Sequence, residues 1–152
     1  MTSLRRILLV EDSERDVELT LEALKENKLA NEVVVARDGA EALDFLYQKG
    51  KFSGRSNELP LLVLLDLKLP KVDGLEVLRR IKSDPQLKLV PVVMVTSSRE
   101  EKDLVESYRL GVNAYVVKPV DFNQFVDSIK QLGFFWAILN EPPPQKVELG
   151  TT

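Results

Sequence analysis

Residues 61–66 read Leu61-Leu62-Val63-Leu64-Leu65-Asp66, the most apolar short run of the chain, and this run stops at a carboxylate. A short continuous apolar run of this kind is typical of a strand that is buried on both faces of a parallel sheet. We therefore predict a central strand over residues 61–65. Shorter runs of the same type predict four more strands, at residues 7–10, 33–36, 92–95 and 114–117.

Apolar side chains at helical spacing follow each predicted strand. The predicted helices run from Ser13 to about residue 26, around residues 42–47, from just after Asp73-Gly74 to about Asp84-Pro85, over residues 100–110, and onward from about Asp121. Asp38-Gly39 is expected to form a turn, and residues 49–60 are expected to form a loop. Five strands that alternate with five helices predict an α/β fold, a doubly wound five-stranded parallel sheet with helices on both faces.

The length of 152 residues suits one domain, which we place at residues 1–139. The remaining tail, residues 140–152, contains Pro142-Pro143-Pro144 and is expected to be extended or disordered. The first apolar run, at residues 7–10, is far too short for a signal sequence or a membrane span. We therefore expect a cytoplasmic protein without a membrane partner.

The composition excludes several classes of chemistry. The chain contains no cysteine and no histidine, so disulfides, thiol nucleophiles, imidazole bases and zinc–thiolate sites are all excluded. A bound metal must therefore use oxygen ligands, which favours a hard cation such as Mg²⁺ or Ca²⁺. The net charge of −3 argues against a nucleic-acid partner, because binding to phosphates needs a basic face.

Reactive side chains stand where the predicted strands end, namely Glu11-Asp12, Asp66, Thr96 and Lys118. The carboxyl ends of parallel strands meet at one edge of the sheet, so we expect these groups in one shallow pocket. Three neighbouring carboxylates repel one another and recruit a cation, and Mg²⁺ suits a site with few carboxylates. A carboxylate can act as a nucleophile that forms an aspartyl-phosphate, while a hydroxyl and an ammonium bind the other phosphoryl oxygens.

These motifs resemble the response-regulator receiver domains of two-component signalling. The matching segments, in register over residues 5 to about 137, are 7–12, 64–70 with Asp73-Gly74, 95–97 and 115–119. The resemblance implies a flavodoxin-like fold with the strand order 2-1-3-4-5. It also implies that the Lys118-Pro119 peptide bond is cis, which is mostly a proline phenomenon.

The resemblance assigns a role to each matching residue. Asp66 is implied as the phosphoacceptor, and Glu11, Asp12, Asp66 and the backbone carbonyl of Lys68 as the Mg²⁺ ligands. Thr96 and Lys118 are implied to bind the phosphoryl group. Tyr115 is implied as the aromatic switch that moves inward when Thr96 is drawn toward the phosphoryl group.

A narrower resemblance is to the small regulators of cyanobacterial-type phytochromes. It is carried by residues 66–74, 81–85 and 91–93, by the long 49–60 loop, and by Phe134-Phe135-Trp136. It implies a sensor histidine kinase, of the phytochrome type, as the phosphoryl donor. The run 134–139 is apolar on every side of a helix, so it either tucks under the tail or forms an interface. We favour an interface, in a homodimer built from the fourth helix, fifth strand, fifth helix and C-terminal extension.

Other functions fit the sequence less well. An aspartyl-phosphate phosphohydrolase generally has a second acid two residues after its nucleophile, where this chain has Lys68. A flavodoxin-like cofactor binder needs a phosphate-binding loop after the first strand, where Glu11-Asp12 would repel phosphate. The thirteen residues after 139 are too few for a DNA-binding output domain. A constitutive dimerisation module with a silent site stays open as an alternative.

We therefore expect a single-domain response regulator that signals by protein–protein contacts. Its chemistry would be limited to its own Mg²⁺-dependent phosphorylation and dephosphorylation, so it would not be an enzyme that turns over external substrates.

Overall fold

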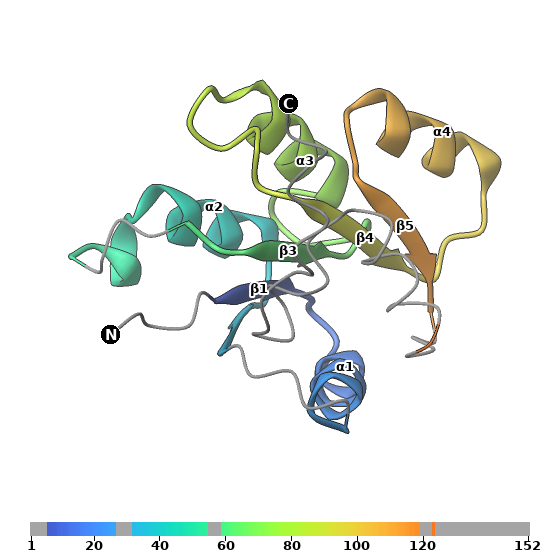
Figure 1. Cartoon of the computed structure of the whole chain (residues 1–152), viewed down its shortest axis with the longest axis horizontal. Coiled ribbons are helices and arrows are strands. Elements are labelled where there is room, and N and C mark those ends of the chain that lie inside the picture. Colours follow the sequence, from blue (N-terminus) through green and yellow to red (C-terminus); the bar gives the residue numbers. More distant parts are fainter. Residues whose placement is uncertain (1–5, 27–31, 55–58, 119–122, 124–152) are drawn as a thin grey trace, which may run out of the picture.

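The computed structural model describes residues 6–26, 32–54, 59–118 and 123. Its centre is a five-stranded parallel sheet in the order β2-β1-β3-β4-β5, shown in Figure 1. The strands are β1 (Ile7–Val10), β2 (Val33–Ala36), β3 (Leu62–Leu65), β4 (Val92–Thr96) and β5 (Ala114–Val117). Every residue of β1, β3 and β4 is buried, so the predicted fold class and the central position of β3 are confirmed.

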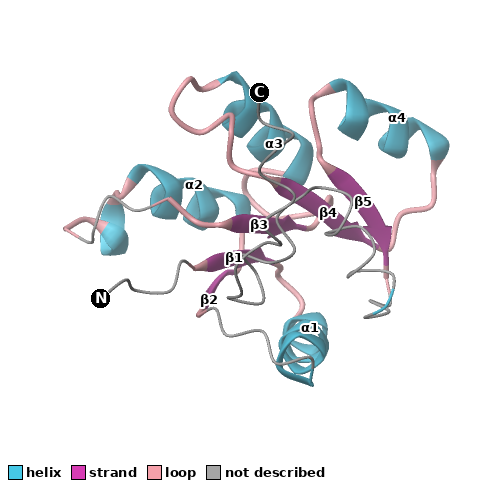
Figure 2. Ribbon diagram, viewed as in Figure 1, coloured by secondary structure: helices cyan, strands magenta, loops and turns pink. Residues whose placement is uncertain are grey.

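Four α-helices lie in the described part of the chain, and Figure 2 shows how they alternate with the strands. They are α1 (Glu14–Glu26), α2 (Gly39–Tyr47), α3 (Gly74–Ser83) and α4 (Glu101–Arg109). The predicted loop 49–60 contains a short 3₁₀ turn, η1 (Gly50–Phe52), and residues 55–58 of that loop lie outside the described part. The predicted fifth helix apart from residue 123, the cis bond at Pro119, Phe134-Phe135-Trp136 and the tail 140–152 also lie outside it.

The two faces of the sheet belong to separate apolar cores. Val63 of β3 shares one core with Leu78 of α3, whereas the next residue, Leu64, shares the other core with Val17 of α1. This alternation follows from the period of two in a strand, where successive side chains point to opposite faces. Helices α2 and α3 therefore cover one face and α1 covers the other, as Figure 1 shows.

At Asp38-Gly39, where we expected a turn, the chain bends and leads directly into α2, which begins at Gly39. The side chain of Asp38 is the N-cap and accepts a hydrogen bond from the backbone N–H of Glu41 at 2.7 Å. An aspartate in this position satisfies one of the N–H groups left free at the start of a helix. Asp73 caps α3 in the same way, through the N–H of Glu76 at 3.0 Å.

Gly74 allows α3 to start against the end of β3. A Cβ atom at this position would lie 2.1 Å from the backbone oxygen of Asp66, which is closer than any real contact. The N–H of Gly74 donates a hydrogen bond to the carbonyl of Leu67 at 2.8 Å. Because residue 74 has no side chain, the loop that follows Asp66 can pack against the start of α3, and this hydrogen bond holds the loop there.

None of the helices in the described ranges combines the length and the apolar character that crossing a membrane requires.

Candidate functional site

The sheet itself aligns the side chains at its carboxyl edge. Beyond the strand ends, backbone hydrogen bonds continue from Asp66 N–H to the carbonyl of Val10 at 3.1 Å and from Lys118 N–H to the carbonyl of Thr96 at 2.8 Å. Residues just past neighbouring parallel strands are therefore held level with one another. The four predicted strand ends meet at one edge, as parallel pairing requires.

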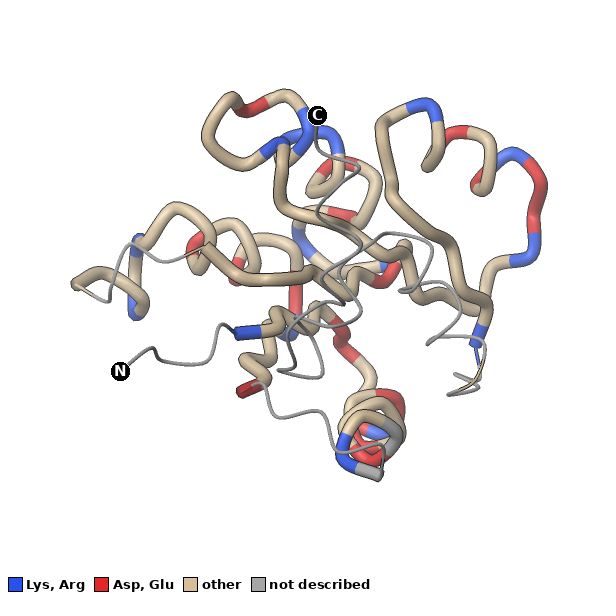
Figure 3. The backbone as a smooth tube through the Cα atoms, in the orientation of Figure 1, with Lys and Arg blue, Asp and Glu red and all other residues tan. Residues whose placement is uncertain are grey.

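Three carboxylates gather at this edge. Glu11, Asp12 and Asp66 each offer an oxygen, and these oxygens all lie within 4.8 Å of one another. Glu11 and Asp66 are buried, at 3% and 7% exposure, whereas Asp12 is exposed. In Figure 3 the acidic link between β1 and α1 is visible as a red segment. Closely spaced hard oxygen ligands with one open side suit a divalent cation that keeps some of its water.

Burial changes the acidity of Glu11. Desolvation raises its pKa to about 7, and the negative charge of Asp66 acts in the same direction. Hydrogen bonds from Lys118 and from the backbone N–H of Ser13, the latter at 3.1 Å, oppose this rise. A positive charge at the cluster would stabilise the ionised form of Glu11.

Lys118 supplies one such positive charge. Its Nζ atom lies 2.6 Å from Glu11 Oε1, 2.8 Å from Asp16 Oδ2 and 3.1 Å from Asp66 Oδ2. The side chain is only 12% exposed. Burial by itself would lower the pKa of Lys118, but hydrogen bonds with Asp16 and Glu11 and the charge of Asp66 outweigh it and raise the pKa above its ordinary value.

Asp16 is the site residue that the sequence analysis missed. The sequence placed it only within the predicted first helix, where its N–H donates to Ser13 Oγ at 3.3 Å. The available signal was its spacing, because Asp16 stands four residues after Asp12 and lies in the first turn of α1. That spacing predicts a neighbouring position but cannot by itself predict a partner 102 residues away.

Thr96 and Tyr115 are connected through Ser98. Thr96 is fully buried, and its Oγ1 accepts a hydrogen bond from the N–H of Ser98 at 3.3 Å. The hydroxyl of half-buried Tyr115 donates to the carbonyl of Ser98 at 3.2 Å. The Ser98 hydroxyl donates in turn to Asp103 Oδ2 at 2.6 Å, so the loop after β4 is tied to the first turn of α4. Burial raises the pKa of Tyr115.

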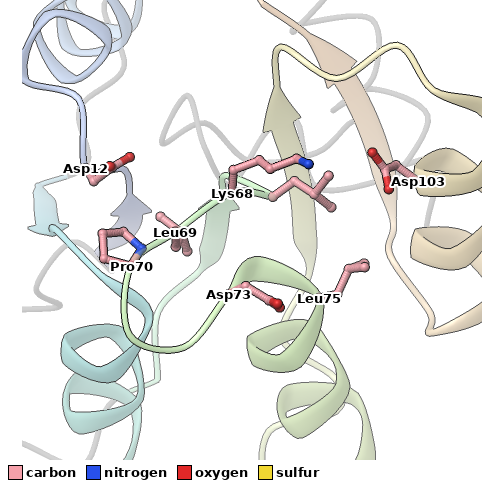
Figure 4. A pocket seen from close by; sticks show the side chains of 8 residues that line it. Asp12, Lys68, Leu69, Pro70, Asp73, Leu75 and Asp103 are labelled. Carbon is pink, nitrogen blue, oxygen red and sulfur yellow. The ribbon is translucent and has the colours of Figure 1, made fainter.

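A cavity of about 420 Å³ opens beside the acidic cluster. Its lining includes Asp12 on one side and Asp103 on the other, with the exposed Lys68 between them, as Figure 4 shows. Asp73 and Leu75 from the start of α3 form its floor in that view. A small molecule therefore has open space from which to approach the cluster.

The structure thus brings together Glu11, Asp12, Asp66 and Lys118 from the predicted set, and it places Thr96 at the end of the neighbouring strand. Lys68 lines the adjoining cavity, and the role of its carbonyl as a ligand stays a prediction. The predicted interface residues Phe134, Phe135 and Trp136 lie outside the described residues.

Comparison with known proteins agrees with this arrangement. Residues 7–130 match the family model of the response regulator receiver domain. The response regulator Rcp1 of Synechocystis sp. is 43% identical over 130 residues, which cover 86% of this chain and 87% of that protein. The structure of the Mn²⁺-bound form of a response regulator Rcp1 has a TM-score of 0.74 at 41% identity, and the match covers 92% of this chain and 99% of that chain.

Two further solved structures are also similar. The bacteriophytochrome response regulator AtBRR is 65% identical with a TM-score of 0.84, covering 92% of this chain and 100% of that chain. The phosphorylated cyanobacterial phytochrome response regulator RcpA is 45% identical with a TM-score of 0.74, covering 88% and 94%. The resemblance to phytochrome response regulators is therefore confirmed, and this chain belongs to the response regulator receiver domain family.

Proposed function

We propose that this protein accepts a phosphoryl group on Asp66 from a phytochrome-type histidine kinase and signals by changing its contacts with other proteins. The observation that carries the proposal is the contact of 3.1 Å between Lys118 Nζ and Asp66 Oδ2 beside the carboxylates of Glu11 and Asp12. This set combines a nucleophilic oxygen, a fixed positive charge and ligands for a cation. Phosphoryl transfer depends almost entirely on such positioning and charge stabilisation.

Receiver domains bind a divalent metal ion at an acidic pocket, and the cluster of this chain has the oxygen donors for it. We propose Mg²⁺ as that ion, held by Glu11, Asp12, Asp66 and the backbone carbonyl of Lys68. When bound, the ion would neutralise charge on the oxygens of the transferring phosphoryl group.

The chain's own residues perform the transfer. A carboxylate oxygen of Asp66 forms a bond to phosphorus while the bond from phosphorus to the nitrogen of the donor phosphohistidine breaks in line with it. Lys118 can bind a phosphoryl oxygen with its ammonium, since it already contacts Asp66. Thr96, buried at the end of β4, can donate its hydroxyl to another phosphoryl oxygen.

A movement of Thr96 toward the phosphoryl group would shift Ser98, which touches both Thr96 and Tyr115. Tyr115 would then adopt a new position, and α4 would follow through the hydrogen bond from Ser98 to Asp103. Only a few contacts change, so the two states differ by about 1–3 kcal/mol. The proposed output is thus a shift between two populated states.

The surface of α4 supports a role in protein contacts. Leu104, Val105 and Tyr108 are 38%, 56% and 51% exposed, and apolar side chains gathered at the surface mark interaction sites. A homodimer that uses α4, β5, the predicted fifth helix and residues 134–136 remains our prediction. The phytochrome partner is supported by the names of the relatives, and the cytoplasm is the expected location.

The protein is proposed to be a phosphoacceptor and not a phosphohydrolase. Lys68 stands two residues after Asp66, where a phosphohydrolase has an acid that protonates the leaving group. An ammonium in that position can bind a phosphate, but it is not the carboxyl group that such enzymes use to protonate the leaving group.

Intact mass measurement after incubation with acetyl phosphate tests the proposal. Wild type with Mg²⁺ is expected to gain one phosphoryl group, and Asp66→Asn is expected to gain none because it lacks the nucleophilic oxygen. Asp44→Asn on α2 is the matched control, since it makes the same chemical change away from the site, and should gain the group as wild type does.

A phosphoryl adduct on Asp66→Asn would contradict the assignment of the phosphoacceptor. If wild type shows no adduct, binding of beryllofluoride distinguishes rapid hydrolysis, in which the complex forms, from a silent site, in which it does not.

A further inference from the structure

The ammonium of Lys118 is shared among three carboxylates that come from different elements. An ammonium has three protons to donate, and here its partners are Glu11 after β1, Asp66 after β3 and Asp16 in the first turn of α1. The distance to Asp16 Oδ2 is 2.8 Å, shorter than the 3.1 Å to Asp66 Oδ2. Asp16 is therefore a direct partner of the lysine and not a distant surface charge.

Asp16 differs from the other two partners in what else it can bind. Glu11 and Asp66 belong, with Asp12, to the carboxylate cluster whose oxygens lie within 4.8 Å of one another, and among the described residues Asp16 is not in that cluster. A cation at the cluster would draw on the oxygens of Glu11 and Asp66. Asp16 would then be the partner of Lys118 with no competing ligand role.

The backbone of Asp16 is well anchored. Its N–H donates to Ser13 Oγ at 3.3 Å, and the N–H of the next residue, Val17, donates to the carbonyl of Ser13 at 2.9 Å. Val17 is 2% exposed and lies in the core between α1 and the sheet. The carboxylate of Asp16 is thus presented from a helix turn that is fixed to the sheet, which makes it suited to orienting a neighbouring group.

We propose that Asp16 is a positioning residue, which holds the Lys118 ammonium beside the phosphoacceptor while Glu11 and Asp66 engage the cation and the phosphoryl group. This inference rests on the proposed function of Asp66. It deepens that function by assigning to α1 a share in the placement of the lysine, so the site is built from the first helix as well as from the strand ends.

The accessibility of Lys118 tests the contact without any phosphorylation. Acetylation of lysines by an N-hydroxysuccinimide ester, read by peptide mass spectrometry, is expected to increase several-fold at Lys118 in Asp16→Ala, because the side chain loses a partner at its open side. Lys25 on α1 serves as the internal reference. Glu18→Ala, which removes an exposed carboxylate two residues away on the same helix, should leave labelling of Lys118 unchanged.

The rate of phosphorylation by acetyl phosphate tests the consequence. Asp16→Ala is expected to slow adduct formation on Asp66 about tenfold, the lower end of the effect of removing a group that orients a direct ligand. Asp16→Asn keeps an acceptor without the charge and should be intermediate. In a Lys118→Ala background the Asp16→Ala change should have no further effect, because a residue that acts through another is silent once that other is gone.

The outcomes separate this inference from the proposed function. If Asp16→Ala matches Glu18→Ala in both measurements, or slows the reaction equally with and without Lys118, the positioning role is overturned while phosphorylation of Asp66 stands. If wild type forms no Asp66-dependent adduct and no beryllofluoride complex, the proposed function fails, and the labelling of Lys118 still decides whether Asp16 holds the lysine. If Asp16→Ala is poorly folded by circular dichroism, Asp16→Asn carries both tests.

Discussion

Helices α3 and α4 are neighbours in the fold, yet they are attached to it very differently. Helix α3 buries Val77, Leu78 and Ile81 completely in the core that it shares with α2 and the sheet. Helix α4, which follows the loop that contains Ser98, buries only Ser107 among its nine residues. An element with few buried apolar contacts opens at low free-energy cost. This difference in buried side chains indicates that α3 is fixed to the sheet, and that a small change at the site can move α4.

The N-terminal ends of the two helices also differ in how firmly they are held. Asp73 caps α3 with its own side chain, whereas the N-cap of α4, Glu100, makes no side-chain hydrogen bond to its helix. The N–H of Glu100 instead donates to Ser98 Oγ at 3.3 Å. The beginning of α4 is thus held by the loop that follows Thr96, and a movement of that loop reaches α4 directly.

Removal of buried apolar volume should give the largest contrast between the two helices. Ile81→Ala in α3 is expected to lower the free energy of unfolding by about 2–5 kcal/mol, because it leaves a cavity in the core. Leu104→Ala in α4, where the side chain is 38% exposed, should change it by about 0.5 kcal/mol or less. Urea unfolding followed by circular dichroism measures both. Equal losses in the two variants would mean that α4 is as firmly packed as α3.

Removal of the N-cap side chains should give a smaller difference between the two helices in the free energy of unfolding. Asp73→Ala is expected to cost about 1 kcal/mol, since the N–H of Glu76 loses its partner. Glu100→Ala should cost less than about 0.5 kcal/mol, because its side chain caps nothing. The same urea titration, performed without Mg²⁺, makes the comparison. A larger loss in Glu100→Ala than in Asp73→Ala would refute the difference between the two starts.

Removal of exposed ion pairs should destabilise the two helices almost equally. This comparison serves as a control for the other two. Glu76 pairs with Arg79 and Arg80 on α3, and Glu106 pairs with Arg109 on α4. Hydrogen bonds from Arg79 and Arg80 lower the pKa of Glu76 to about 2, and Arg109 lowers the pKa of Glu106. These exposed pairs are screened by solvent and salt.

Glu76→Gln and Glu106→Gln are therefore expected to shift the urea midpoint at pH 7 slightly and equally, and less in high salt. Because both carboxyl pKa values are lowered in the folded protein, any stabilisation is present above the ordinary value near 4.5 and is lost as the pH falls, toward about 2 for Glu76. A salt-insensitive loss confined to α3 would show that its ion pairs share in the anchoring.

Local patterns were sufficient to predict the sheet. Each strand was predicted within one residue of its observed bounds, because continuous apolar runs such as 7–10 and 114–117 have few alternatives in an alternating fold. The start of α2 was less clear, since Asp38-Gly39 is equally typical of a turn and of a helix cap. The N–H of Gly39 also donates a hydrogen bond to the carbonyl of Pro70 at 3.3 Å, a long-range contact that the local sequence does not reveal.

The site residues that follow strand ends were predicted from the sequence, whereas the site residue that belongs to a helix was missed. Glu11, Asp66 and Lys118 follow strands, so parallel pairing alone brings them together. Asp16 reaches Lys118 only because α1 lies over the sheet edge, and no local pattern contains that information. The predictions for residues 134–136 and for the fifth helix concern parts of the chain outside the described residues, so they remain predictions.

The contact between Asp16 and Lys118 joins residues 102 positions apart and has a consequence for the order of folding. Contacts between distant residues form only after the intervening chain has been organised, because closing a long loop costs entropy that local contacts do not repay. The carboxylates come from the first half of the chain, but their ammonium follows β5. A chain that is still being synthesised therefore presents Asp66 without its lysine, and the contact between Lys118 and Asp66 forms only when β5 has paired.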